Sequence, residues 1–132
     1  MNISNIDDNK NLISNSLGFY LYELLGVDYS GIYIANTELR AMSEKMGIEI
    51  KLSDNHKMFG ELLKVAKDNG RLSEALEVIK KLMESRLAIY EELANNFPKA
   101  EDATSEWTIK AKRAIRKIEN AIKEVQNESV SS

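Results

Sequence analysis

The chain has 132 residues, a net charge of −3 and 43% hydrophobic residues, with six Gly, one Pro and no Cys. This balance predicts a single all-α domain over residues 1–132, and it is not that of a disordered chain. The absence of Cys excludes disulfides, thiolate zinc sites and a cysteine nucleophile. A polar N-terminus argues against a secretion signal, and no apolar stretch approaches the roughly 20 residues of a membrane span. We therefore expect a cytoplasmic protein without a membrane partner.

The charges are distributed unevenly along the chain. Residues 1–55 contain eight acids and four bases, whereas residues 110–123 contain six bases and only one acid, Glu119. A basic face of this kind could contact nucleic acid or an acidic protein, although a solvated face is its more common meaning.

The N-terminal third predicts two helices separated by a break. The first runs from about Asn9 to Gly26, and its segment Leu17–Leu25 is apolar almost all round, so we expect it at the centre of the fold. The pattern breaks over residues 27–35, where two glycines flank a short polar segment. A short helix capped by Asn36 or Thr37 then ends at Gly47.

Apolar and charged residues alternate over residues 48–52, and a fragment of the same pattern occurs at residues 32–34. This period of two could form a small two-stranded ribbon. An extended loop with alternate buried side chains is the preferred interpretation, because isolated ribbons are marginally stable. Ser53 or Asp54 is then expected to cap a helix that ends at Asn69-Gly70.

The clearest pattern is an apolar stripe along a helix predicted over residues 72–97. Its positions alternate in steps of four and three, the 3.5-residue period with which one helix faces another. The stripe consists of Leu72, Leu76, Ile79, Met83, Arg86, Tyr90, Leu93 and Phe97.

A matching stripe lies on a final helix that is expected to begin between Pro98 and Ser105 and to end near Gln126. It consists of Trp107, Ala111, Ala114, Ile118, Ala121 and Val125. Two long helices with matching stripes and a short link predict an antiparallel C-terminal hairpin. We therefore expect a bundle of four main helices plus a short helix, followed by a frayed tail at residues 127–132.

Arg86 is a cation within an otherwise apolar stripe, so its guanidinium must pair or reach water. The preferred interpretation places its stem along the helix and its head near an acid such as Glu23. The functional alternative is a polar key that gives a binding surface its specificity. Its stripe neighbours Met83 and Tyr90 would belong to the same surface.

The loop aromatics Tyr29 and Tyr33 are expected to be half-exposed, because a glycine-flanked loop offers them little cover. Trp107 on the final helix and the basic residues Arg113, Arg116 and Lys117 complete the set of interaction candidates. No aromatic residue is interleaved among the bases after Trp107, so a nucleic-acid surface that stacks on bases is weakly supported.

Residues 39–48 resemble the first helix and turn of a helix-turn-helix, which makes residues 37–69 a degenerate candidate for DNA binding. The spacing of apolar and small residues from Phe59 to Leu82 resembles one tetratricopeptide repeat. This second resemblance covers one copy only, and it implies a helical hairpin.

No catalytic, metal or phosphate-binding motif is present, and His56 is the only His. We therefore expect a protein without a cofactor or metal that is not an enzyme. The predicted function is a helical protein-interaction module, either self-associating or the small accessory subunit of a larger complex. A nucleic-acid-associated protein is the alternative, and a small-molecule sensor with a pocket lined by aromatics and Arg86 is a third class.

Overall fold

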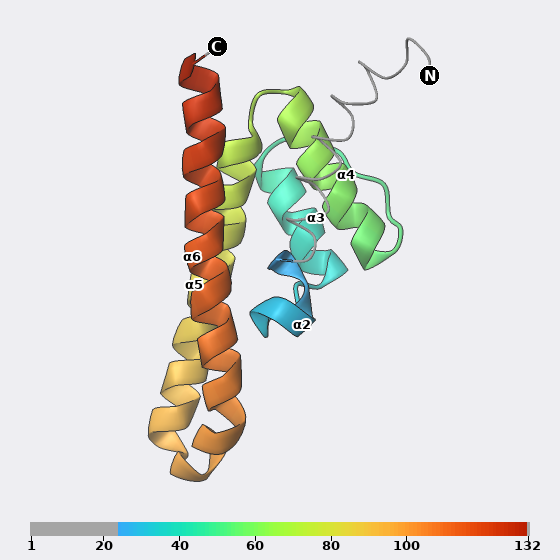
Figure 1. Ribbon diagram of the computed structural model, residues 1–132. Helices are drawn as coiled ribbons and strands as arrows, with labels where there is room; N and C mark the ends of the chain where they lie inside the picture. Colours follow the sequence, from blue (N-terminus) through green and yellow to red (C-terminus); the bar gives the residue numbers. More distant parts are fainter. Residues whose placement is uncertain (1–23, 132) are drawn as a thin grey trace, which may run out of the picture.

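The computed structural model describes residues 24–131 of the chain, and it is all-α (Figure 1). Most of the predicted first helix lies outside these residues. Its last two apolar positions, Leu24 and Leu25, are buried in the core. No strand occurs within residues 24–131, so the loop interpretation of residues 32–34 and 48–52 is confirmed over the two-stranded ribbon.

The small helices come first along the chain. They are α2 (Val27–Ser30), α3 (Asn36–Lys45) and α4 (Asn55–Asp68). The helical turn α2 was missed by the sequence prediction, because its four residues are too few to show a period. The cap of α3 was also misassigned: Ala35 is the N-cap, and its backbone N–H donates to the carboxylate of Glu38 at 3.2 Å.

The turn between α4 and the next helix ends where the sequence predicted. Gly70 has φ +69°, a left-handed conformation that side chains with a Cβ rarely adopt. The N–H of Arg71 donates to the carbonyl of Ala66 at 2.7 Å and that of Gly70 to Lys67 at 3.0 Å, which is the Schellman ending of a helix. This tight ending directs the chain straight into the long helix that follows.

Two long helices form the rest of the molecule: α5 (Leu72–Asn96) and α6 (Glu101–Ser131), joined by the 3₁₀ turn η1 (Pro98–Ala100). The ion pairs Lys80–Glu119 and Glu91–Lys112 join them with opposite sequence directions, so the hairpin is antiparallel as predicted. Helix α6 continues to Ser131, beyond the end expected near Gln126. Residues 127–131 contain no Gly or Pro that would stop it.

The core lies where the small helices meet one side of the hairpin. Helices α3 and α4 pack against α5, and α2 packs against α6. Small Ala residues on α6 let the two long backbones approach closely, as the matched stripes indicated. Figure 1 shows the consequence: the end of the hairpin that contains η1 extends beyond α2 with no small helix beside it. We call this the distal half of the hairpin, and the covered part the proximal half.

Candidate interaction surface

Six of the nine predicted site residues gather around one segment, residues 26–34, which we call the α2 loop. Inside it, the buried Ser30 accepts a hydrogen bond from the N–H of Ile32 at 3.0 Å, and its own hydroxyl lies 2.9 Å from the carbonyl of Gly26. The buried Ile32 and Ile34 anchor the loop on the core side, while Tyr33 between them points outward. The loop therefore has a fixed shape before the hairpin contacts it.

Three hairpin side chains hold the α2 loop, and a fourth packs against one of them. Arg86 contacts the carbonyl of Tyr33 at 3.4 Å, and Tyr90 donates its hydroxyl to the carbonyl of Gly31 at 2.7 Å. Arg113 lies over the ring of Tyr29 at 3.9 Å, a cation–π geometry, and it also donates to the Tyr29 carbonyl at 3.3 Å. The ring of Trp107 packs against Tyr90 with centroids 5.6 Å apart.

Gly31 is the point of closest approach. Its φ of +70° is left-handed, and a Cβ built there would lie 3.1 Å from the carbonyl oxygen and 3.2 Å from the Cα of Trp107. Both atoms belong to the α6 backbone, which cannot move aside as a side chain can. Only glycine therefore lets the α2 loop lie this close to α6.

Arg86 pairs with an acid of its own chain. Its guanidinium binds the carboxylate of Glu38, whose other oxygen caps α3. The expectation that Arg86 must pair is confirmed, although the partner is Glu38; the suggested Glu23 lies outside the described residues. A role as a specificity key stays a prediction, and the cation it would use is already bound to Glu38.

The remaining candidates separate into buried and exposed residues. Met83 is fully buried, so its assignment to an interaction surface was wrong: the small helices cover this part of the stripe. Tyr33 is exposed and Tyr29 half-buried, close to the predicted half-exposure. Arg116 and Lys117 are exposed on α6, away from the α2 loop.

The stripe becomes exposed beyond Arg86. Leu93 and Phe97, the C-cap of α5, continue the stripe, and Ile89 lies beside it, four positions before Leu93. The accessible fractions of Ile89, Leu93 and Phe97 are 55%, 37% and 61%. Residues four apart share one face of a helix, so they form an apolar ridge. Trp107 of α6 is also exposed, at the boundary where the α2 loop meets the distal half. We call these four residues the distal apolar surface.

Sequence reasoning counted Leu93 and Phe97 in the stripe but did not name them, or Ile89, as site residues. A signal was available in the helix lengths. At 1.5 Å per residue, the 25 residues of α5 span about 37 Å and the 14 residues of α4 about 21 Å, so the small helices cannot cover the whole hairpin.

Other chemistry finds no support within residues 24–131. No group of three or more His, Asp or Glu side chains there could hold a metal ion. No helix in this part of the chain is long and apolar enough to cross a membrane. The helix-turn-helix resemblance also fails, because residues 46–54 separate α3 from α4, whereas the motif uses a turn of about 3–4 residues.

Comparison of the chain with protein-family models, with curated proteins and with solved structures finds no match in any of the three.

Proposed function

We propose that the chain is a helical protein-interaction module whose binding surface is the distal half of the hairpin. The observation that supports this is the distal apolar surface. Exposed apolar residues are normal when scattered, but a ridge that continues a buried stripe past its cover is typical of a binding face. Its aromatic members, Phe97 and Trp107, are residue types enriched in the centres of interfaces.

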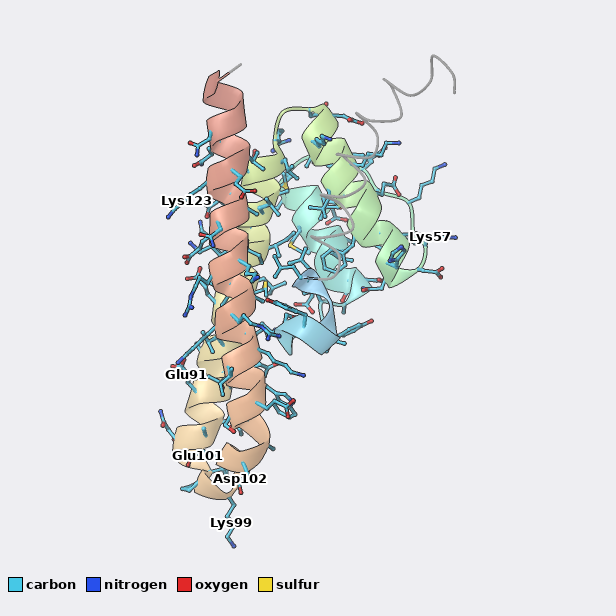
Figure 2. The ribbon with its side chains drawn as sticks, in the orientation of Figure 1. Lys57, Glu91, Lys99, Glu101, Asp102 and Lys123 are labelled. Atoms are coloured by element: carbon cyan, nitrogen blue, oxygen red, sulfur yellow. The ribbon has the colours of Figure 1, made fainter. Side chains whose placement is uncertain are left out.

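The surroundings of this surface suit a protein partner. Figure 2 shows Lys99, Glu101 and Asp102 around the tip of the hairpin, and Glu91 farther along it. Charged side chains around an apolar ridge give the polar rim that keeps an exposed interface soluble and sets its orientation. The partner is either a second copy of this chain or another protein to which it is a small subunit.

Site-specific photo-crosslinking tests this proposal. A photoreactive amino acid replaces Leu93 in one variant and Lys57 in the control, and both are irradiated in a native extract. Lys57 is exposed on α4, far from the distal half (Figure 2). We expect a defined adduct from position 93 only. An adduct of twice the chain mass means self-association, and another mass means a different partner. Equal labelling at both positions, or none at position 93, would contradict the proposal.

A nucleic-acid-associated protein is the second candidate. Arg116, Lys117 and Lys123 are exposed, and among the side chains that the structure describes, residues 24–127 apart from Asp28, no acid forms an ion pair with them. Binding of labelled DNA and RNA should then weaken steeply with rising salt, because contacts to phosphates release counterions. Arg116→Gln with Lys117→Gln should reduce that slope. No binding at low ionic strength would remove this candidate.

A further inference from the structure

The face of α6 opposite its buried residues has its own regular pattern. Its residues are all exposed and are spaced in steps of three and four, the spacing that keeps positions on one side of a helix. In Figure 2 the labelled Asp102 and Lys123 lie toward opposite ends of this helix. We call this face the outer face, and it consists of Asp102, Ser105, Ile109, Lys112 and Arg116.

The charges along this helix are opposite on the two sides of Ile109. Asp102 lies seven positions before it and Arg116 seven positions after it; Glu106 lies three before it and Lys112 three after it. Glu101 lies eight positions before Ile109 and Lys117 lies eight positions after it, again with opposite charges. At the centre, 67% of the Ile109 surface is accessible, although Ile is apolar.

The chain balances these charges only in part. Lys110 pairs with Glu106 at 3.3 Å and Lys112 with Glu91 at 3.9 Å. Among the described side chains, which are those of residues 24–127 without Asp28, neither Asp102 nor Arg116 takes part in an ion pair.

Like charges four residues apart on a helix destabilise it. Helix α6 has two such pairs on this side, Asp102 with Glu106 and Lys112 with Arg116. The helix dipole favours acids in the first turn of α6, but it does not favour bases in the middle of a helix.

We propose that the outer face of α6 binds the outer face of a second copy, antiparallel, about a two-fold axis at Ile109. Antiparallel pairing places Asp102 at the level of Arg116 of the second copy, and Arg116 at the level of its Asp102. The two Ile109 side chains meet at the axis and cover each other. A parallel pair would place each charge beside its like, which is unfavourable.

This pairing is weak and depends on salt, because it consists mainly of exposed ion pairs. It also gives the dimer a particular form: the two hairpin tips, each containing η1, lie at opposite ends. The outer face and the distal apolar surface are different surfaces, so either one can fail its test without affecting the other.

Disulfide trapping tests the axis directly, since the chain has no Cys of its own. Ile109→Cys places two thiols at the axis, within the Cα separation of about 4.4–6.8 Å that a disulfide needs. Asn120→Cys is the control: it is exposed on the same helix but lies 11 residues from the axis, so its two copies are about 33 Å apart.

We expect mild oxidation to give a covalent dimer from Ile109→Cys at least about tenfold faster than from Asn120→Cys. Slow crosslinking at both positions, or equal rates, would overturn the proposal. Equal fast rates would indicate a parallel pair, in which every position meets its own copy.

Two charge-reversal variants, measured separately and as a mixture, test the ion pairs across the proposed interface. Asp102→Arg with Glu106→Arg makes both ends of the outer face basic, and Lys112→Glu with Arg116→Glu makes both ends acidic. Each variant alone should be monomeric by light scattering at low salt, where the native chain is a dimer. Their equimolar mixture should form a heterodimer. A dimer from either variant alone, or none from the mixture, would refute the antiparallel pairing; circular dichroism checks that both stay helical.

Discussion

The two halves of the hairpin have the same helical stripe but different surroundings. In the proximal half, where the small helices pack against the hairpin, Leu76, Ile79 and Met83 are fully buried. In the distal half, Leu93 and Phe97 occupy equivalent positions of the same stripe and remain accessible. The comparison teaches that a helical period identifies which face is apolar, whereas a residue's contribution to folding depends on what covers that face.

The largest expected effect is a difference between the halves in the free energy of unfolding. Met83→Ala should cost about 2–5 kcal/mol, because it leaves a cavity in a packed core. Leu93→Ala, which removes a partly exposed side chain, should cost less than about 1 kcal/mol. Urea unfolding followed by circular dichroism measures both. Equal costs would mean that the distal half is covered in solution and would remove the distinction.

The boundary between the halves can be tested at Gly31. Gly31→Ala should cost about 1–3 kcal/mol more than Gly47→Ala, because both glycines are left-handed but only the first approaches another backbone. A Cβ at Gly47 meets nothing within 4 Å, so Gly47→Ala measures only the cost of placing alanine in the left-handed backbone conformation. If the two variants are equally stable, the close approach of the α2 loop to α6 is not tight.

Arg86 ties the last covered part of α5 to α3. Arg86→Met should destabilise the fold by about 1–2 kcal/mol, between the values for exposed and buried ion pairs. A double-mutant cycle with Glu38→Gln separates the pair from the packing of the arginine stem. Coupling within error of zero would show that the two side chains do not interact in solution.

The smallest effect is expected at the far end of the proximal half, where Arg71 donates two hydrogen bonds of 2.8 Å to Glu74. These bonds lower the pKa of Glu74 below its ordinary value. Because the pKa of Glu74 is lower in the folded state than the unfolded-state value of 4.5, the ionised carboxylate stabilises the fold at pH values above 4.5. This stabilisation is lost as the pH falls through the folded-state pKa.

Glu74→Gln should therefore unfold at slightly lower urea than the native chain at pH 7, and the gap should close in acid. Glu84→Gln, an exposed acid on the same helix, is the control. A gap for Glu74→Gln that stays constant across this pH range would show that the Arg71 pairing does not act through the carboxylate.

Much of the fold follows from local sequence rules. The hairpin, the turn at Gly70 and the helix over residues 36–45 depend on periods and on a glycine that the chain itself displays. The ion partner of Arg86 could not be predicted in this way, since Glu38 lies 48 positions earlier. The burial of Met83 could not be predicted either, because a period does not show how far neighbouring helices extend.

The candidate surface was anticipated in type but not in position. Aromatic and basic residues were expected to meet a partner, and the structure uses Tyr90 and Arg113 to hold the α2 loop. Trp107 was among the predicted residues and belongs to the distal apolar surface. Ile89, Leu93 and Phe97 were not predicted as site residues, and their exposure results from the length of α5 relative to α4.

Trp107 is the single tryptophan of the chain, and it lies where the α2 loop meets the hairpin. Indole emission shifts to longer wavelength when its surroundings become more polar, so the intrinsic fluorescence of this protein reports one location. Release of the loop would shift the spectrum red, and cover of the ring by a ligand would shift it blue. The chain thus contains its own optical probe of the boundary between its covered and uncovered halves, with no label attached.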